Sequence, residues 1–387
     1  MSPTITGYLL LGVAALPFIY YFLALYSSWR FFHSTEPATY GSDFTPGVSI
    51  LKPVRGLDPD AYENFASFCR QDYPEYELVF CLGSSSDAVF PVIERLQRNF
   101  PERRIRVLFG SGRTATNDKV AKLTRLASEA EHDYLVISDS DVRVRPDYLR
   151  RVVAPLSNPK VGAVTCFYVS TEETSFAENL QSMGMIADFY PGLLVAKQLD
   201  GVKFALGPTI ATTRSRLADF GGYQTIENRP ADDLLVGRLI AEQGYEIRFS
   251  RYIVETVADY QSLRELVHKR LRWLVVMRHM RPWGHIGLLF TQGFPWSLAA
   301  IAVHPTAGTA AAFLATYMLL RIAMAWSVGV WGLKQRVAVR KFYLLAVWDA
   351  MAFGIWAFSF IRKTVRWRGG DYYIRDGMLV PAASAGK

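Results

Sequence analysis

Residues 134–144 read YLVISDSDVRV, an apolar run that ends in two carboxylates one residue apart. The run Tyr134–Ser138 favours a buried strand followed by a turn. In an extended or turning chain, residues two apart can point the same way, so Asp139 and Asp141 can face one hard cation that also grips a diphosphate. An isolated Asp-x-Asp pair is more often a turn or a helix cap. Directly after a buried strand, the metal-binding interpretation is favoured.

The segments around this strand alternate between strand and helix patterns. Strands separated by helical stretches of this length indicate βαβ units. We therefore predict a doubly wound, mostly parallel α/β sheet within residues 33–280, with ligands at the carboxyl ends of its strands. The expected strands are Val48–Leu51, Leu78–Leu82, Ile105–Phe109, Tyr134–Ser138 and Val161–Phe167, and the expected helices are Asp60–Arg70, Ala88–Asn99 and Asn117–Ala130.

Further acidic residues stand where strands end or helices begin. Asp87 follows the strand-like run LVFCLGSSS. Two roles fit this residue: it accepts a hydrogen bond from a base or ribose, or it caps the next helix, and the first is not favoured over the second. Asp232 and Asp233 open a predicted helix over 234–243. The helix dipole favours acidic residues in a first turn, so we expect one of the two to cap the helix, which leaves the other without a structural explanation.

A basic helix is predicted over residues 263–280, and it contains His268-Lys269-Arg270-Leu271-Arg272-Trp273. Beside a membrane segment, such a helix can present a face to anionic lipid. It can equally clamp a diphosphate, because arginine donates paired hydrogen bonds to phosphate. At Asn117-Asp118-Lys119, a capped helix start is favoured over a phosphate site.

Apolar segments lie at both ends of the chain. No charged residue occurs from Met1 to Trp29, and residues 5–26 give about 33 Å of helix, enough for a bilayer core of about 30 Å. The segment lacks the basic start and the short apolar core of a cleaved signal peptide, so we interpret it as a retained anchor. Arg30 then places the next residues in the cytosol. The expected C-terminal segments are 286–303, 307–333 and 342–361, the last with Asp349 near its middle.

The charges that flank the C-terminal segments cannot all be cytosolic if every segment crosses, so we expect that 286–303 or 342–361 does not cross. We predict an N-terminal membrane anchor over 1–32, a cytosolic catalytic domain over 33–280, and a C-terminal membrane region and tail over 281–387.

The composition fits an enzyme that is partly embedded in a membrane. The 387 residues are 50% apolar and 20% charged, with a mean hydropathy of +0.10, which excludes disordered and collagen-like chains. The net charge of +8 can attract nucleic acid, anionic lipid or a phosphorylated substrate. The membrane segments favour the last two, so no nucleic-acid partner is expected. Cys69, Cys81 and Cys166 form no Cys-x-x-Cys pair, which argues against structural zinc.

In this order, the motifs resemble those of the ceramide glucosyltransferase family, membrane-bound GT-A glycosyltransferases related to processive polysaccharide synthases. The resemblance runs over most of the chain. Where the family has (Gln/Arg)-x-x-Arg-Trp, this chain has Lys269 in first place, which keeps a positive charge but loses a planar donor and leaves the role of that residue open. The matching segments are Val48–Pro53, Gln71–Pro74, Asp87, Asn117–Lys119, Ser138–Val144, Asp233 and Arg272-Trp273.

The resemblance implies a GT-A fold and a role for each matched residue. It implies a uridine site at Val48–Lys52 and Asp87, and Mg²⁺ or Mn²⁺ on Asp139 and Asp141, bound to the donor diphosphate. It also implies that Asp233 takes the proton from the acceptor hydroxyl. The remaining implied roles belong to the basic helix: Lys269 on the donor side, Arg272 on the departing diphosphate and Trp273 in the sugar pocket.

The implied reaction is an inverting transfer of glucose from UDP-glucose to the primary hydroxyl of a membrane lipid of the ceramide type. Two alternatives remain: transfer from UDP-N-acetylglucosamine to a hopanoid or other lipid, and an inactive lipid-binding scaffold tethered to the membrane. A transporter subunit or a processive synthase would need more spans.

The expected location is integral to a membrane, with the catalytic domain in the cytosol: a bacterial inner membrane, or a Golgi-type membrane in a eukaryote. Met183–Leu206 is apolar enough to touch lipid, but its four charged residues argue against a span. It fits the border of a lipid entrance or a helix buried against the sheet.

Overall fold

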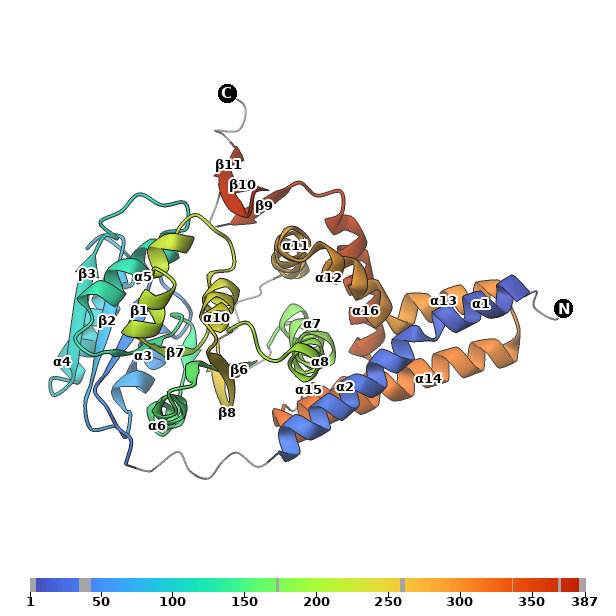
Figure 1. The fold of residues 1–387 in the computed structure, drawn as a ribbon, viewed down its shortest axis with the longest axis horizontal. Helices are drawn as coiled ribbons and strands as arrows, with labels where there is room; N and C mark the ends of the chain where they lie inside the picture. The colour runs from blue at the N-terminus through green and yellow to red at the C-terminus, as the bar shows by residue number, and fades with distance from the viewer. Residues whose placement is uncertain are drawn as a thin grey trace. The chain divides into compact units, whose positions relative to one another are not determined.

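The computed structural model describes residues 5–34, 43–171, 174–257, 262–335, 337–367 and 370–382. The chain forms two compact units (Figure 1). We call residues 35–172 and 202–259 the sheet unit, and residues 1–34, 173–201 and 260–387 the helical unit. The expected boundaries at 32 and 280 differ from this division: residues 173–201 and 260–280 group with the apolar helices, because their contacts are with those helices.

A mixed, predominantly parallel sheet forms the sheet unit, as predicted. Among the described residues it has eight strands in the order β3-β2-β1-β4-β7-β6-β8-β5. Strands β1, β2, β3 and β4 pair in parallel, as do β6 and β8, whereas β7 runs antiparallel to β4 and β6, and β5 runs antiparallel to β8. The strands are β1 Val48–Pro53, β2 Tyr76–Leu82, β3 Arg104–Phe109, β4 Tyr134–Ile137, β5 Val142–Arg143, β6 Val161–Ser170, β7 Ile210–Thr213 and β8 Glu246–Thr256.

Helices connect the strands as the βαβ pattern predicts, and the five expected strands and three expected helices all occur. The helical segments of the sheet unit are α3 Ala61–Cys69, α4 Phe90–Asn99, α5 Asp118–Glu129, α6 Tyr148–Val153, η1 Ala154–Ser157, α9 Arg214–Asp219, η3 Tyr223–Ile226 and α10 Asp232–Glu242.

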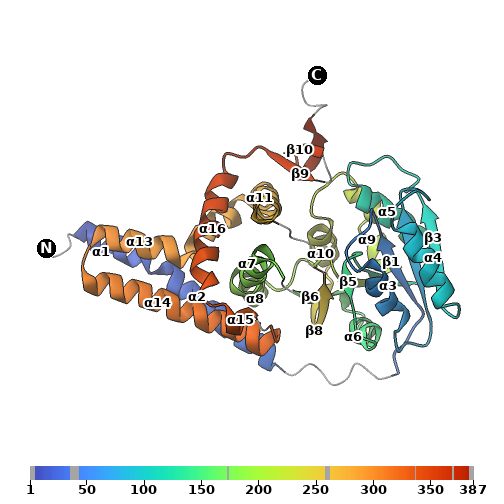
Figure 2. The same cartoon turned by 180° about the vertical axis from the view of Figure 1, so that it is seen from behind.

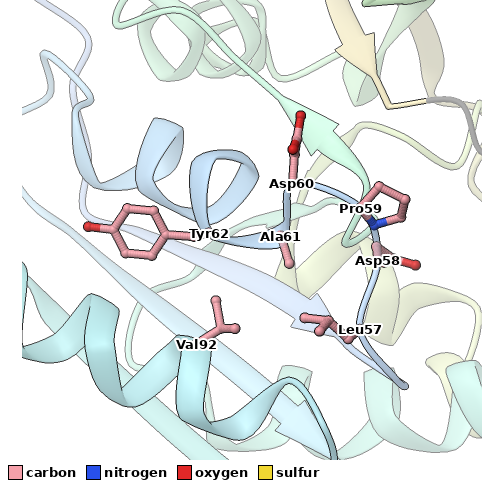
Figure 3. A pocket seen from close by; sticks show the side chains of 7 residues that line it. All are labelled: Leu57, Asp58, Pro59, Asp60, Ala61, Tyr62 and Val92. Carbon is pink, nitrogen blue, oxygen red and sulfur yellow. The ribbon is translucent and has the colours of Figure 1, made fainter. Parts of the chain in front are cut away.

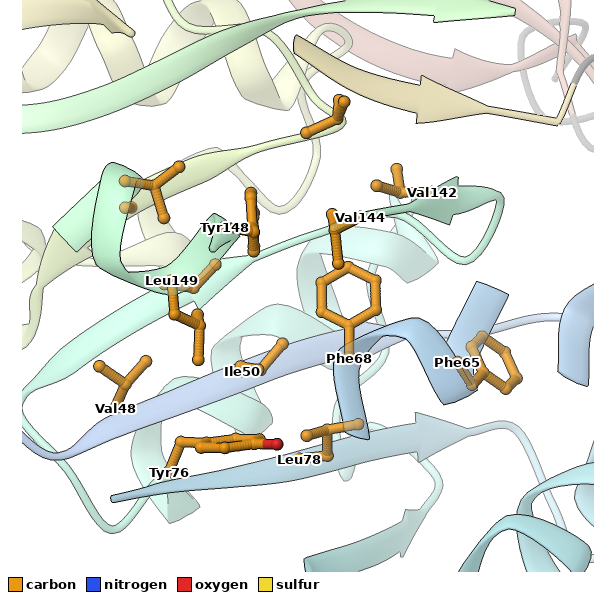
Figure 4. Packing of buried hydrophobic residues seen from close by; sticks show 14 of the residues in the cluster. Val48, Ile50, Phe65, Phe68, Tyr76, Leu78, Val142, Val144, Tyr148 and Leu149 are labelled. Carbon is orange, nitrogen blue, oxygen red and sulfur yellow. The ribbon is translucent and has the colours of Figure 1, made fainter. Parts of the chain in front are cut away.

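The core of the sheet unit lies where α3 and α6 cover the central strands (Figure 4). Every residue of β1 and of β2 is buried, including Ser49, Lys52 and Glu77, which explains why neither strand alternates between apolar and exposed polar residues. The ring of Phe68 lies 5.7 Å from that of Tyr148, and the ring of Phe65 lies 4.9 Å from that of Phe80. Burial of each such ring contributes about 2 kcal/mol. This core fixes the carboxyl ends of β1 and β4, where the candidate site lies.

The helical unit contains two helical segments, among the described residues, that are long and apolar enough to cross a membrane: Ile5–His33 and Ala307–Gly332, of 29 and 26 residues. Figures 1 and 2 show α1 and α2 alongside α13 and α14. The pair Pro282–Thr291 and Gly293–Val303 is bent by 61°, and Leu344–Ser359 is shorter than a span. These are the two segments of which we expect one not to cross.

The helical segments of this unit are α1 Ile5–Ala14, α2 Leu16–His33, α7 Phe176–Gly184, the π-helix η2 Met185–Phe189, α8 Tyr190–Asp200, α11 Leu263–Met280, α12 Pro282–Gly287, η4 Leu288–Thr291, α13 Gly293–Val303, α14 Ala307–Ala325, the π-helix η5 Trp326–Gly332, α15 Val337–Arg340 and α16 Leu344–Ser359.

The apolar stretch 183–206 is mostly helical, as α8 packs against α2 and η2 contacts α14. Its helical part, α7, η2 and α8, belongs to the helical unit, and both interpretations of this stretch stay predictions. A small antiparallel sheet of β9 Thr364–Trp367, β10 Gly370–Arg375 and β11 Met378–Pro381 packs against α11 and completes the unit.

Candidate active site

The candidate site begins at the carboxyl ends of the parallel strands β1 and β4. Asp139 and Asp141 follow β4 directly, and both are partly exposed. The backbone N–H of Ser138 donates to the carbonyl of Leu51 at 3.2 Å, which ties the turn to β1. The Oγ of Ser140, between the two aspartates, donates to the carboxylate of Asp58. The two carboxylates thus stand on a turn that neighbouring loops hold in place.

Lys52 of β1 donates hydrogen bonds to this turn. Its side chain is fully buried, and its Nζ donates to Ser138 Oγ at 3.1 Å and to the backbone carbonyl of Asp139 at 2.9 Å. The same Nζ lies 3.4 Å from the ring centroid of Phe68. Burial lowers the pKa of Lys52 to about 7, against the opposing charges of Asp139 and Asp141. Lys52 therefore positions Asp139, and its predicted contact with uridine stays a prediction.

Lys119 links the carboxylates of two separate elements. It lies in the first turn of α5, and its Nζ is 2.7 Å from Asp139 Oδ1 and 3.2 Å from Asp232 Oδ2. Only 14% of its side chain is exposed. Burial alone would lower the pKa of Lys119, but the charges of Asp139, Asp232 and Asp233 raise it above its ordinary value. A permanent positive charge therefore lies among three carboxylates.

Asp233, the third of these carboxylates, accepts hydrogen bonds from two backbone N–H groups. Its Oδ1 accepts from the N–H of Leu234 at 2.8 Å, and its Oδ2 accepts from the N–H of Gly207 at 3.0 Å. Burial, and after it the negative charge of Asp232, raise the pKa of Asp233 to about 6. A carboxylate with such a pKa is ionised at neutral pH and is a stronger base than an exposed aspartate.

The expectation that one of these two aspartates caps α10 is wrong. The N-cap position is Ala231, whose methyl group cannot accept a hydrogen bond and whose backbone is left-handed, with φ of 55°. Asp232 instead pairs with Lys119, and Asp233 faces Gly207. The left-handed backbone at Ala231 costs about 1 kcal/mol or more. In this arrangement both carboxylates have partners outside the helix.

Gly207 borders the space between the carboxylates. A Cβ atom at this position would lie 3.2 Å from Asp139 Oδ2 and 3.3 Å from Asp233 Oδ2. The absence of a side chain therefore leaves room for a small ligand atom against both groups. Within the described residues there is no cluster of three metal-binding side chains. Asp139 and Asp141 nonetheless fit Mg²⁺ or Mn²⁺, because such ions take one or two carboxylates and complete their shell with phosphate and water.

Asp87 lies in a second part of the site. Its Oδ1 accepts from the N–H of Gly56 at 3.1 Å and from that of Val89 at 3.2 Å, so it joins the loop after β1 to the start of α4. It also lines a pocket of about 410 Å³ together with Arg55 and Lys122. Both interpretations of Asp87 have a structural basis, since the residue stabilises a helix start and faces a pocket.

A second pocket, of about 480 Å³, lies beside the aspartate turn (Figure 3). Asp58, which accepts from Ser140, stands at its edge with Asp60 from the same loop, and Val92 of α4 closes the opposite side. Asp58 therefore connects this pocket to the turn that carries Asp139 and Asp141, because it lines the pocket and accepts from Ser140 of that turn.

The basic motif lies in the other unit, on α11. The guanidinium of Arg270 lies 4.9 Å from the ring centroid of Trp273, and the ammonium of Lys269 lies 5.7 Å from it. The ring of Phe189 packs against Trp273 at 5.9 Å. Arg272, on the same helix, is partly buried. The structure places Asp87, Asp139, Asp141 and Asp233 in the sheet unit and Lys269, Arg272 and Trp273 in the helical unit, and their roles stay predictions.

Two residues that contact the predicted aspartates had no assigned role in the sequence analysis. Lys119 belongs to the Asn117–Lys119 motif, where Asn117 does cap α5 by accepting from the N–H of Val120. The capped-helix interpretation is thus confirmed, yet the lysine two residues later carries the contacts to Asp139 and Asp232. Gly207 carries no chemical group, and only the tertiary structure shows what it adjoins.

Comparison with known proteins gives a consistent set of relatives. The model of the family described as glycosyl transferase family 21 matches residues 9–380. Ceramide glucosyltransferase 3 of Caenorhabditis elegans is 23% identical over 365 residues, which are 92% of this chain and 78% of that protein. Ceramide glucosyltransferase 1 of the same organism is 24% identical over 280 residues, 70% of this chain and 57% of that protein. The chain thus spans little more than half of the second relative.

Among solved structures, the mannosyltransferase PcManGT from Pyrobaculum calidifontis, in complex with GDP-Man and Mn²⁺, is similar in fold. Its TM-score is 0.57 at 20% identity, and the match covers 91% of this chain and 99% of that one. The likeness identifies the GT-A glycosyltransferase fold.

Proposed function

Because the chain belongs to glycosyltransferase family 21, we propose that it transfers glucose from UDP-glucose to the primary hydroxyl of a ceramide-type membrane lipid, with inversion at the anomeric carbon. The observation that carries the proposal is Asp233. It is a half-buried carboxylate with a raised pKa, and it adjoins Asp139 across Gly207 at the strand end where GT-A folds bind the donor. The relatives named ceramide glucosyltransferase support the choice of acceptor and sugar.

Asp233 acts as the general base of a single displacement. Its carboxylate takes the proton of the lipid hydroxyl while the hydroxyl oxygen bonds to the anomeric carbon. The bond from that carbon to the UDP oxygen breaks, and the electron pair leaves with UDP. No covalent intermediate forms, so one base is sufficient.

Asp139 and Asp141 would hold the divalent ion, which would supply positive charge against the departing diphosphate. Lys119 keeps Asp139 oriented by a charged contact and separates it electrostatically from Asp232. Lys52 fixes the backbone of the same turn. PcManGT, which shares the fold, was solved with GDP-Man and Mn²⁺, and this supports the use of a divalent ion.

The pocket lined by Asp87 takes the uridine part of the donor. Asp87 accepts hydrogen bonds from the base or ribose, and Arg55 and Lys122 supply positive charge near the phosphates. Arg272 stabilises the leaving diphosphate, Trp273 lines the sugar pocket, and Lys269 supplies charge in place of the family's planar donor. The protein sits in a membrane through its apolar helices, with the sheet unit in the cytosol.

Product analysis tests the proposal directly. The full-length purified protein is incubated with UDP-glucose or UDP-N-acetylglucosamine and with ceramide, a hopanoid polyol or diacylglycerol, and the lipids are measured by mass spectrometry. We expect glucosylceramide from the first donor. N-acetylhexosaminyl hopanoid as the main product would replace the proposal by the hopanoid alternative. Absence of both transfer and UDP-sugar hydrolysis would leave the lipid-binding scaffold.

The metal assignment has its own test. We expect excess EDTA to abolish transfer, and Asp139→Asn to weaken UDP-glucose binding, because the diphosphate loses its main counter-charge. Asp60→Asn is the matched control: Asp60 carries an exposed carboxylate in the neighbouring hollow, in a left-handed conformation that asparagine tolerates. Full activity in EDTA would show that the two aspartates act as hydrogen-bond acceptors instead.

A further inference from the structure

A short helix of the helical unit, α12, leaves nearly all of its side chains exposed. Among its six residues, only His285 is buried. Trp283 is 83% exposed, and Ile286, three residues later, is 43% exposed. Residues three apart are neighbours on a helix surface, so these two side chains form an apolar face outside the protein. Exposed apolar surface marks an interaction site, and tryptophan is enriched where a membrane meets water.

His285 joins this helix to the end of α16. Its carbonyl accepts from the indole N–H of Trp356 at 2.9 Å, and its Nε2 lies 2.9 Å from Ser359 Oγ. Its ring lies 4.9 Å from that of Phe360. The exposed apolar residues of α12 therefore lie beside a second exposed apolar group, which is formed at the end of α16 by Phe358, Phe360 and Ile361.

Cations stand at the ends of the same segments. Arg278, in the last turn of α11, donates to the carbonyl of Ser359 and, at 3.0 Å, to the carbonyl of Arg362. The end of α11 is thereby tied to the residues that follow α16. Arg281, Arg362 and Lys363 are all exposed, and we call these three residues the cation cluster.

No carboxylate balances the cation cluster along this part of the chain. Between Glu265 and Asp371, the single acidic residue is Asp349. It is buried and pairs with Arg321. Exposed cations beside exposed apolar side chains match a partner that carries negative charge above an apolar interior. A membrane surface with anionic lipids has this structure.

The helices that follow α12 favour a membrane over a protein as the partner. Pro282–Thr291 and Gly293–Val303 together are long and apolar enough for a broken span, and they meet at an angle of 61°. The second of these segments, α13, packs against α1 of the first candidate span (Figure 1). A helix that bends away from membrane helices and exposes a tryptophan fits the plane of the lipid headgroups.

We infer that α12 and the end of α16 lie in the headgroup layer of the membrane, with Trp283 in contact with lipid, and that the cation cluster binds the phosphate groups of anionic phospholipids. This surface belongs to the helical unit alone. The inference does not depend on the glycosyl transfer proposed above, so the two can fail separately.

Lipid selectivity tests the cation cluster without an activity measurement. The full-length protein is reconstituted in phosphatidylcholine, and electron paramagnetic resonance compares its association with spin-labelled phosphatidylglycerol and spin-labelled phosphatidylcholine. The wild type should prefer phosphatidylglycerol. Arg281→Gln combined with Lys363→Gln should lower this preference by about twofold or more, because a gain of about fivefold at each cation is averaged over all the lipids around the protein.

A second pair of substitutions controls for the change in net charge. Arg98→Gln combined with Lys160→Gln also removes one arginine and one lysine, both at exposed positions of the sheet unit. This control should leave the preference for phosphatidylglycerol unchanged. An equal loss of the preference in the two double variants would show a general effect of net charge and overturn the lipid site.

Fluorescence quenching tests the position of α12 itself. Ile286→Cys is labelled with a small fluorophore, and the label should react selectively because Cys69, Cys81 and Cys166 are buried. We expect brominated lipid to quench the label at position 286 and iodide in the water to quench it weakly. Ser84→Cys, on an exposed loop of the sheet unit, should show the opposite pattern.

The two measurements together decide the inference. Loss of the preference in the Arg281 and Lys363 variant alone, with quenching by lipid at position 286, supports it. An unchanged preference in that variant overturns the role of the cation cluster. Iodide quenching at position 286 as strong as at position 84 overturns the position of α12, and this readout stands even where the cation variants do not accumulate in the membrane.

Discussion

Asp232 and Asp233 are neighbours in sequence, but the fold gives their carboxylates different partners. Asp232 pairs with Lys119 at 3.2 Å, whereas Asp233 accepts two backbone hydrogen bonds and borders the space beside Gly207. The Lys119 ammonium occupies Asp232 Oδ2, whereas a ligand can approach Asp233 from the space beside Gly207. The proton of the acceptor hydroxyl is therefore expected to go to Asp233.

The first prediction separates the two residues by mutation. Asp233→Asn keeps the size of the side chain but cannot take a proton, so transfer should fall by about 10²- to 10⁴-fold with little change in UDP-glucose binding. Asp232→Asn should keep transfer within about tenfold of the wild type and cost about 1 kcal/mol of stability through the lost ion pair. Steady-state kinetics and binding calorimetry measure both. If Asp232→Asn abolishes turnover while Asp233→Asn retains it, the base assignment is off by one residue.

Stability measurements exclude unfolding as the cause of that loss. The pKa of Asp233 is raised in the folded protein, so its ionised form destabilises the fold above about pH 6, and this cost vanishes near pH 4. Asparagine has no such cost. At pH 7, Asp233→Asn should therefore melt at the same temperature as the wild type or higher, and a lower melting temperature would contradict the burial of the charge.

The second prediction concerns the pH dependence of the reaction. The base must be ionised, so kcat/KM should fall as the pH drops through about 6 and level off above it. Asp232 is the second cause of the raised pKa of Asp233, so Asp232→Asn should move this acidic limb to lower pH. Asp60→Asn, on the surface, should leave the limb in place. A limb near pH 4 in the wild type would show that the base is an ordinary exposed carboxylate.

At this scale, the sequence predicted Asp139 and Asp141 as site residues because they come directly after a buried strand, and Asp233 because the family resemblance marks one of two adjacent aspartates. The structure brings Asp139 and Asp233 together beside Gly207, and the roles of all three residues stay predictions. Lys119 was in a recognised motif but without a role, since its contacts are to Asp139, 20 positions along, and to Asp232 on another element. Gly207 offered no signal, because what matters there is the space it leaves.

At the scale of elements, strands with continuous apolar runs were predictable and short ones were not. Strands β1 and β2 are buried along their whole length, so the sequence pattern and the structure agree. Strands β5 and β7 have only two and four residues, and each is defined by antiparallel pairing with a distant segment. Pairing of that kind is decided by tertiary contacts, which no local pattern encodes.

The third prediction concerns the start of α10. Ala231 precedes the two aspartates in a left-handed conformation, with φ of 55°. Ala231→Gly relieves this strain but makes the unfolded chain more flexible, so we expect a net gain of about 0.5 kcal/mol in the free energy of unfolding, and Ala231→Val should lose about 1 kcal/mol or more. Thermal melting in detergent measures both.

A matched control for this helix start is Ala241→Gly, at a regular position near the end of α10. There glycine has no strain to relieve, so the substitution should destabilise by about 0.5–1 kcal/mol. Equal destabilisation by Ala231→Gly and Ala241→Gly would show that the turn before Asp232 is not left-handed in solution.

At the scale of the whole molecule, the sequence located the apolar segments and the α/β domain but not how the chain divides between the units. Residues 173–201 lie between two strands of the large sheet in sequence, which is why they were assigned to the catalytic domain. Their contacts are with α2, α14 and α16 instead. Asp188 explains part of this grouping, because its carboxylate pairs with Arg321 of a membrane helix. Such a pairing becomes visible only when both segments are folded.

The last prediction is the orientation of the sheet unit. UDP-sugars are made in the cytosol, and Arg30 at the end of the first span places the following residues there.

Cys69, Cys81 and Cys166 are all buried, so the wild type should give little background with a thiol reagent that does not cross membranes. Ser84→Cys, on an exposed loop of the sheet unit, should react only after the membrane is opened. Thr6→Cys, at the opposite end of the first span, should react in intact cells and so serves as the control. Labelling of Ser84→Cys but not of Thr6→Cys from outside would invert the topology and place the donor site away from the supply of nucleotide sugar.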